Sequence, residues 1–184
     1  MLYILLADGF EEVEAVAPLD VLRRAEIEVK TIGVTGSTVT GAHGIEITAD
    51  LQITELDGAI PDGIILPGGM PGTLNLQKST EVQALLQKCY SSQKLIAAIC
   101  AAPMIIGELG MLNGRRATCF PGFEDSLTGA NLLDDGIVCD GNFITAKGAG
   151  VALKFGAAIV DYFIDPGSVH GCRGNRILSQ MQLG

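Results

Sequence analysis

The stretch Leu95-Ile96-Ala97-Ala98-Ile99-Cys100-Ala101-Ala102-Pro103 decides the fold. Its first five residues form a short apolar run, which is typical of a strand buried on both faces of a sheet. Pro103 suits the first turn of a helix, where its missing N–H leaves no hydrogen bond unmade. The pattern therefore predicts a strand over Leu95–Ile99 followed at once by a helix over Cys100–Leu109. Cys100 stands at the junction of the two.

The same alternation of short apolar runs and helical spacing extends along the chain, as in proteins built from βαβ units. One hairpin is expected within Gly36–Asp50 and another over Ile137–Ala146. We predict one doubly wound α/β domain over residues 1–184. Its tail, from about residue 168, is harder to interpret and is expected to form a short helix from about Arg176 that covers the sheet edge. Further strands are expected at Leu2–Ala7, Glu28–Val34 and Gly63–Leu66, and further helices at Glu11–Ala25, Thr80–Tyr90 and Val151–Ile164.

Composition limits the classes of function open to the chain. Its 184 residues suffice for one domain with a substantial core. The 21 acidic and 12 basic residues give a net charge of −9, which argues against a nucleic-acid partner. No apolar run reaches the roughly 18 residues of a membrane span, and residues 1–7 lack the basic flank of a signal peptide. We therefore expect a cytoplasmic protein without a membrane partner.

Five cysteines without a CxxC pair are expected to be free thiols in a reducing compartment. Only His43 and His170 could join them as metal ligands, and neither stands near a cysteine pair, so no zinc site is expected. His170 stands two residues before Cys172, which is a weak signal. For both histidines a surface or structural role is favoured over that of a catalytic base.

Three segments directly follow predicted strands: residues 8–14, 67–73 and 100–103. Ligands of open parallel sheets bind outside the carboxyl ends of the strands. These three segments can therefore share one crevice, in which we expect the functional site.

Cys100 carries the strongest chemical signal. The small residues Ala98 and Ala102 resemble those that flank the nucleophile in a strained strand-to-helix turn. A thiol at a helix start meets the positive end of the helix dipole, which favours the thiolate and predicts a lowered pKa. The alternative is a small buried hydrophobic residue, the usual role of cysteine. The pattern favours the reactive thiolate.

Glu14 is the second candidate. Pro18, four residues later, removes the helical hydrogen bond to the Glu14 carbonyl and is expected to bend the helix there. A partly desolvated carboxyl that points into the crevice can hold a proton and hydrogen-bond the thiolate. The acidic run over residues 11–14 can equally be a helix start that complements the dipole. Both interpretations stay open at this stage.

The Gly68-Gly69 pair follows a predicted buried strand and offers a backbone N–H without side-chain obstruction. Together with the amide of Ala101, the Gly69 amide can form an oxyanion hole. A plain strand-ending turn is the alternative interpretation of the two glycines.

With these residues in place, the chain resembles the DJ-1/ThiJ/PfpI superfamily. The likeness is greatest to the branch of the parkinsonism-associated protein deglycase and its bacterial ThiJ-like relatives. It runs from Met1 to about Phe163, and its motifs are specific when taken together. The matching stretches are LADGFEEVE over residues 6–14, PLDVLRRA over 18–25, LPGG over 66–69, IAAICAAP over 96–103 and GAG over 148–150.

The resemblance implies a flavodoxin-like three-layer sandwich, with a mostly parallel sheet and helices on both faces, that forms a homodimer. It implies that Cys100 is the nucleophile or redox thiol and that Glu14 is a protonated carboxyl bonded to it. Gly69 and Ala101 would supply the oxyanion-hole amides. Asp20 and Arg24 match positions near the dimer interface and the site.

Some positions depart from the family pattern. In the stretch Thr118-Cys119-Phe120-Pro121, Phe120 takes the place of a histidine found in the human-type branch. His43 takes the place of an arginine of that branch, which leaves its cationic contribution open. Ala101 stands where the peptidase-like branch has a histidine, so proteolysis is not expected. Cys119 is a candidate resolving thiol for Cys100.

These residues support two main hypotheses. The first is a cofactor-independent enzyme on reactive carbonyls, a glyoxalase or deglycase that takes a small aldehyde or a glycated substrate. Cys100 would form the hemithioacetal, and Glu14 would be the general acid and base. The second is an oxidative-stress sensor or redox-regulated chaperone that works through oxidation of Cys100. An amidase or peptidase is disfavoured because the catalytic histidine is absent. No cofactor or metal is expected.

Overall fold

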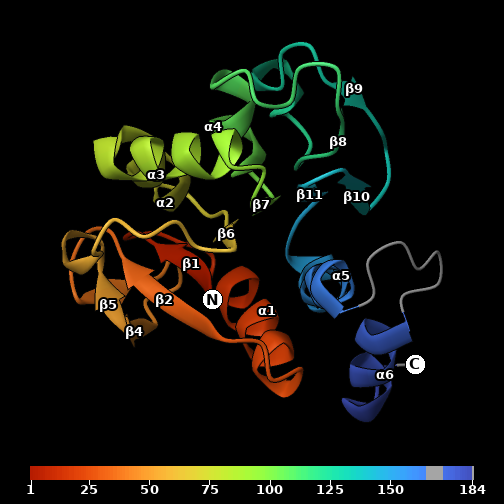
Figure 1. The fold of residues 1–184 in the computed structure, drawn as a ribbon, viewed down its shortest axis with the longest axis horizontal. Helices are drawn as coiled ribbons and strands as arrows, with labels where there is room; N and C mark the ends of the chain where they lie inside the picture. Colours follow the sequence, from red (N-terminus) through yellow and green to blue (C-terminus); the bar gives the residue numbers. More distant parts are fainter. Residues whose placement is uncertain (165–171, 184) are drawn as a thin grey trace.

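The structure is a computed structural model that describes residues 1–164 and 172–183; His170 lies outside the described residues. At its centre is a seven-stranded sheet of order β10-β11-β7-β6-β1-β2-β5 (Figure 1). Neighbouring strands are parallel, except that β10 and β11 run antiparallel. The predicted mostly parallel α/β sheet is therefore confirmed. Its strands are β1 (Leu2–Leu6), β2 (Val29–Gly33), β5 (Leu51–Gln52), β6 (Gly63–Leu66), β7 (Leu95–Ile99), β10 (Ile137–Asp140) and β11 (Phe143–Ala146).

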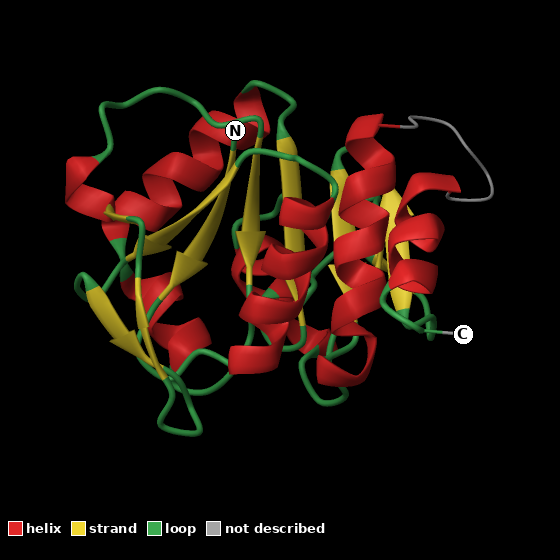
Figure 2. Ribbon diagram, turned by 90° about the horizontal axis from the view of Figure 1, so that it is seen from below, coloured by secondary structure: helices red, strands yellow, loops and turns green. Residues whose placement is uncertain are grey.

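Helices cover both faces of the sheet. Successive residues of a strand point to opposite faces, so Leu2 and Ile4 of β1 enter one hydrophobic core and Tyr3 and Leu5 enter the other. Figure 2 shows the strands side by side behind one helical layer. The first core is closed by α1 (Glu12–Arg24), α5 (Ala152–Ile164) and α6 (Cys172–Gln180), and the second by α2 (Gly72–Lys78), α3 (Thr80–Ser91) and α4 (Pro103–Glu108).

The helix that carries Glu14 is held tightly against its neighbour. Pro18 is buried in the middle of α1. A Cβ on Gly156 of α5 would lie 2.8 Å from the Cα of Pro18, so only glycine allows this approach of the two helices. The close packing fixes α1, and with it Glu14, over the sheet.

Three helices differ from what the sequence predicts. Helix α4 begins at Pro103 rather than at Cys100, because residues 100–102 form the turn out of β7. Helix α2 was not predicted, since the glycine and proline around its start are typical of a loop. Helix α6 begins at Cys172 rather than near Arg176, and it packs on α5 instead of the sheet edge.

Smaller elements complete the fold. The hairpin expected within residues 36–50 is present as the antiparallel pair β3 (Thr38–Thr40) and β4 (Glu46–Thr48). None of the helices in the described part of the chain has the length and apolarity needed to cross a bilayer. The remaining short elements are β8 (Arg116–Ala117), β9 (Asn131–Leu132), and the 3-10 turns η1 (Ile53–Glu55), η2 (Glu124–Ser126) and η3 (Ala149–Val151).

Candidate active site

Cys100 occupies a strained turn at the end of β7. Its φ angle is +64°, a left-handed conformation that non-glycine residues adopt at a cost of roughly 1–2 kcal/mol. The backbone on both sides holds it there: the Cys100 N–H donates to the Ala146 carbonyl, and the Cys100 carbonyl accepts from the Phe120 N–H, both at 2.8 Å. Strain that the surroundings enforce is typical of functional positions. The residue is only partly buried.

Two backbone amides face the sulfur of Cys100. The N–H groups of Ala101 and Gly69 both act as hydrogen-bond donors toward it, which favours its ionised form. Gly69 follows β6 with a φ of +88°, and a Cβ on it would lie 2.3 Å from the Glu11 nitrogen, so glycine is needed there. The two amides predicted from the sequence are thus brought together on the thiol.

Glu14 lies beneath the same sulfur and is 1% exposed. Its Oε2 accepts a hydrogen bond from the Gly68 N–H at 2.9 Å. Its Oε1 is buried, and no described residue gives it a hydrogen bond of normal geometry. A Cβ on Gly68 would lie 2.7 Å from both Glu14 Oε2 and Cys100 Cβ. Gly68 is therefore the residue that lets the carboxyl and the thiol approach each other.

The thiol and the carboxyl titrate as a coupled pair. Burial raises the pKa of Glu14 to about 7, although hydrogen bonds from Cys100 and Gly68 oppose the rise. Burial and the negative charge of Glu14 raise the pKa of Cys100 to about 12, although the amides of Ala101 and Gly69 oppose it. Between about pH 7 and about pH 12 the pair thus holds one proton and one negative charge.

A helix dipole is not what ionises Cys100, contrary to the expectation from the sequence. Helix α4 has six residues and begins three residues after the thiol, whereas the effect of a helix dipole fades within the first turn. Burial and the Glu14 carboxylate act in the opposite direction and are larger. Ionised sulfur therefore requires that the shared proton reside on Glu14.

His43 is not placed as a base for Cys100. Its side chain is 67% exposed, and its Nδ1 donates to Glu12 Oε2 at 2.9 Å, with Glu11 Oε1 at 3.5 Å. Glu12 Oε1 also accepts the backbone N–H groups of His43 and Ile45, and so ties the β3–β4 loop to α1. The three side chains could hold a metal ion. Glu12 and His43 already satisfy each other, which accounts for their arrangement without one.

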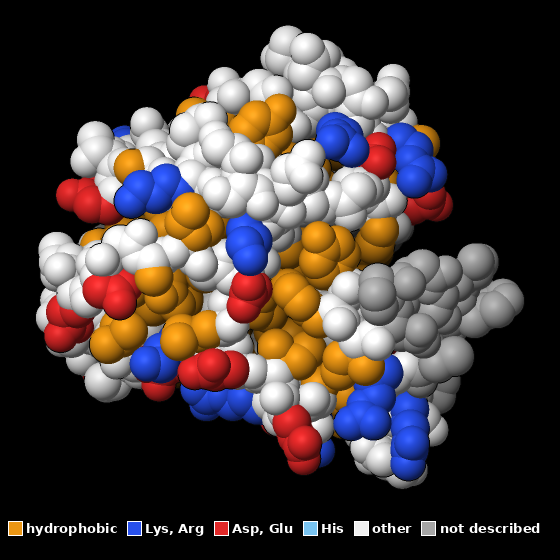
Figure 3. Space-filling view, in the orientation of Figure 1, with side chains coloured by type: hydrophobic (Ala, Val, Ile, Leu, Met, Phe, Trp, Pro, Cys, Tyr) orange, Lys and Arg blue, Asp and Glu red, His pale blue; other side chains and the backbone are white. Residues whose placement is uncertain are grey.

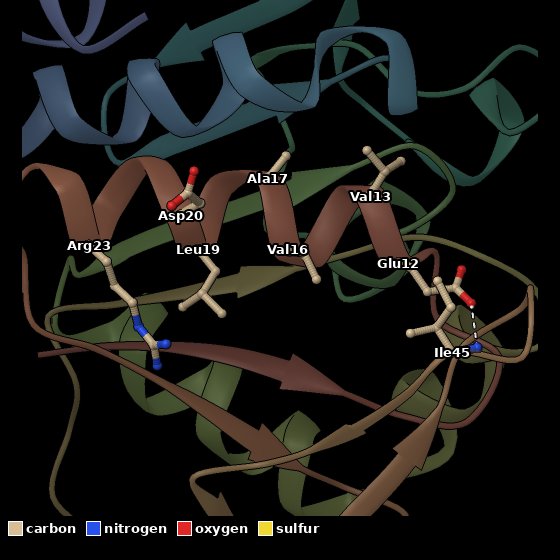
Figure 4. A pocket seen from close by; sticks show the side chains of 8 residues that line it. All are labelled: Glu12, Val13, Val16, Ala17, Leu19, Asp20, Arg23 and Ile45. Atoms are coloured by element: carbon tan, nitrogen blue, oxygen red, sulfur yellow. Dashed lines mark hydrogen bonds between the residues drawn. The ribbon is translucent and has the colours of Figure 1, made fainter. Parts of the chain in front are cut away.

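Asp20 and Arg24 lie away from the catalytic pair. Arg24 Nε donates to Asp20 Oδ2 at 2.9 Å, one helical turn apart on α1. Asp20 lines a groove of about 710 Å³ along α1, which does not include Cys100 (Figure 4). Figure 3 shows hydrophobic side chains gathered over α1 on this face. The groove is mainly apolar, and its lining residues are Glu12, Val13, Val16, Ala17, Leu19, Asp20, Arg23 and Ile45.

The side chains of Cys119 and Phe120 lie in different surroundings: Cys119 is in a hydrophobic core, and the Phe120 ring is next to Gly148. Cys119 is 4% exposed and belongs to the core under α2, α3 and α4, whereas Cys100 packs against the core of the opposite face. The structure therefore does not bring Cys119 to Cys100 as a resolving thiol. The Phe120 ring instead lies against Gly148, next to Glu14.

Two contributors to the site were not identified as such from the sequence. The Gly68 N–H donates a hydrogen bond to Glu14, although the sequence indicated a role only for Gly69 of the Gly68-Gly69 pair. The Ala149 N–H faces the Glu14 carboxyl and lowers its pKa. The GAG stretch over residues 148–150 was a signal for this contact, but its position over Glu14 depends on the tertiary structure.

The chain is similar to proteins of a known family. The sequence model of the DJ-1/PfpI family matches residues 1–162. Protein DJ-1 homolog B of Arabidopsis thaliana is 38% identical over 160 residues, which cover 86% of this chain but only 36% of that protein. A protein of Pyrococcus abyssi that is named a deglycase is 34% identical over 148 residues, 78% of this chain and 87% of its own length.

The fold has close counterparts among solved structures. A mutant of a DJ-1 superfamily protein from Salmonella typhimurium superposes with a TM-score of 0.91 at 31% identity. The match covers 100% of this chain and 98% of that one.

Proposed function

Because the chain belongs to the DJ-1/PfpI family, we propose that it is a cofactor-independent enzyme that converts reactive α-oxoaldehydes to hydroxy acids. The relative from Pyrococcus abyssi that is named a deglycase supports a role of this protective type. The observation that carries the proposal is the Cys100–Glu14 pair. It combines a partly buried cysteine in a strained turn with two amide donors and a buried carboxyl.

The single negative charge of the pair belongs on sulfur. Ionised Glu14 would be a charge at a position that is only 1% exposed, and the removal of a carboxylate from water is costly. Ionised Cys100 would be a charge at a partly exposed position with two amide donors and, from protonated Glu14, a third donor. The proton therefore resides on Glu14, and Cys100 is the nucleophile.

The reaction follows from this distribution. The thiolate adds to the aldehyde carbon of methylglyoxal, and the resulting oxyanion accepts hydrogen bonds from the amides of Gly69 and Ala101. Glu14 gives its proton to this oxygen and, as a carboxylate, takes the hydrogen from the former aldehyde carbon. Glu14 delivers this proton to the neighbouring carbon, and the hydroxyl proton of the first carbon passes to the oxygen of its neighbour. The neighbouring carbon thereby becomes the alcohol, and the first carbon becomes a thioester. Water then cleaves the thioester to lactate and the free thiol.

The same steps describe a deglycase if the aldehyde has first added reversibly to an amine or thiol of another protein. The direct test is the formation of lactate from methylglyoxal by the purified chain without added metal or cofactor. Lactate formation no faster than in a buffer blank would contradict the proposal.

A second candidate role uses the same sulfur as an oxidation sensor. Cys100 is only partly buried, whereas Cys89 and Cys119 are buried, and a thiolate oxidises before a thiol. Mild peroxide is expected to convert Cys100 to the sulfinic acid before either buried cysteine changes, as measured by peptide mass spectrometry. The exposed Cys139 is the control, because no backbone amide is among the groups that shift its pKa, whereas two amides favour the ionised form of Cys100. Earlier oxidation of Cys139 than of Cys100 would remove the basis for this role.

The groove along α1 supports the proposal that the protein is a homodimer. Val13, Val16 and Ile45 are 44%, 45% and 58% exposed, and together they form an apolar surface (Figure 4). Contiguous apolar surface of this kind marks interaction sites. Val16→Glu is expected to shift the protein from dimer to monomer in sedimentation velocity, whereas Val16→Leu leaves the dimer intact. A wild-type chain that sediments as a monomer at all concentrations would contradict this.

A further inference from the structure

Phe120 lies at the rim of the Cys100–Glu14 pair, and the chemistry described above does not use it. Its N–H donates to the Cys100 carbonyl at 2.8 Å, which fixes the Phe120 backbone beside the nucleophile. Its side chain is 47% exposed. An exposed aromatic ring beside a reactive group offers apolar contact to a molecule bound there.

Gly148 lies next to both the Phe120 ring and the Glu14 carboxyl. A Cβ built on Gly148 would lie 3.3 Å from Phe120 Cδ2 and 3.9 Å from Glu14 Oε1. The ring and the buried carboxyl oxygen thus both lie close to the same side of Gly148. Glu14 in turn hydrogen-bonds the thiol. A small molecule that reacts between Cys100 and Glu14 therefore has the Phe120 ring as a neighbour.

The charges around the Cys100–Glu14 pair restrict the kind of small molecule that can bind there. The charge that acts on Cys100 is that of Glu14, and Glu11 adds a second negative charge near Glu14. Among the described residues, no lysine or arginine is part of the surroundings that shift either pKa. These negative charges disfavour an anionic group bound beside the pair. An uncharged substituent is therefore favoured there.

We infer that Phe120 is a specificity-determining residue whose ring contacts the carbon substituent of an uncharged α-oxoaldehyde. The inference rests on the proposed function. Glyoxal carries only hydrogen at this position, methylglyoxal carries a methyl group and phenylglyoxal a phenyl group. The ring contact grows along this series, so the wild-type kcat/KM increases in the same order.

The test is to measure kcat/KM for the three aldehydes, as formation of glycolate, lactate and mandelate, in four proteins. These are the wild type, Phe120→Ala, Phe120→Tyr and the control Leu109→Ala, which truncates an exposed leucine elsewhere. Phe120→Ala is expected to lower the ratio of phenylglyoxal to glyoxal kcat/KM by about 5- to 10-fold, the size of one lost aromatic contact. Phe120→Tyr keeps the ring and the ratio, as does Leu109→Ala.

The possible outcomes distinguish a failure of the role of Phe120 from a failure of the proposed function. If the wild type forms the acids but the ratio is the same in Phe120→Ala, the inference is overturned and the proposed function stands. If the wild type forms none of the three acids, the proposed function itself fails. A shifted pH profile in Phe120→Ala would show that the ring acts through Glu14 rather than through the substrate, and would also overturn the inference.

Discussion

Replacing Cys100 with serine is expected to lower the rate of lactate formation from methylglyoxal by about 1000-fold or more, because it removes the nucleophile. Serine has nearly the size of cysteine and adopts the same turn. Its hydroxyl, however, is a much weaker acid than a thiol. It therefore stays neutral near pH 7 and does not give its proton to Glu14. The two amides would then face a neutral oxygen. The measurement is the rate of lactate formation at saturating methylglyoxal.

The control for this substitution is Cys139→Ser, which makes the same change at an exposed position on the edge strand β10. It is expected to keep the wild-type rate. Thermal unfolding of both variants shows whether each is folded. A folded Cys100→Ser protein that retains a tenth or more of the wild-type rate would rule out Cys100 as the nucleophile.

Glu14→Gln is expected to lower kcat by about 100-fold or more, within the range that general acid–base groups contribute. Glutamine keeps the shape and can still accept the Gly68 N–H, but it cannot pass a proton. The pH dependence changes as well. In the wild type the doubly protonated pair is inactive, so the rate rises with pH through a midpoint at about pH 7 and levels off above it, where the pair has lost one proton. In Glu14→Gln the rise moves to alkaline pH.

Glu11→Gln serves as the matched control, because it removes one negative charge near Glu14 without touching the shared proton. It is expected to keep the position of this rise within a few tenths of a pH unit, since burial and the hydrogen bonds of Cys100 and Gly68 affect the pKa of Glu14 more than the charge of Glu11 does. A Glu14→Gln protein with the wild-type rate and pH profile would contradict the assigned role of Glu14.

Much of the sheet is predictable because its strands are short apolar runs bounded by polar or turn-forming residues. Gly63–Leu66 and Leu95–Ile99 are predicted to the residue. The convergence of Glu14, Gly69 and Cys100 is predictable for a related reason. They follow β1, β6 and β7, which are neighbours in the sheet, and the carboxyl ends of parallel strands share one edge.

The features that sequence reasoning missed depend on contacts between distant segments. The raised pKa of Cys100 results from burial and from a carboxylate 86 positions away in the sequence, and no local pattern reports either. The approach of Phe120 to Gly148 and the bond from Glu12 to the His43 loop are of the same kind. Helix α2 was missed because its start is rich in glycine and proline.

The central claim is that Glu14 holds the proton that the pair shares, and that Cys100 holds the charge. The decisive measurement is the pH dependence of Cys100 alkylation, resolved by peptide mass spectrometry, in the wild type and in Glu14→Gln. If Glu14 is the proton holder, wild-type Cys100 becomes a reactive thiolate with a midpoint at about pH 7, and its apparent pKa rises toward or above the ordinary value of 9.0 in Glu14→Gln. The opposite order, a wild-type thiol that stays unreactive above pH 9 and becomes more reactive in Glu14→Gln, would place the charge on Glu14 and contradict the account.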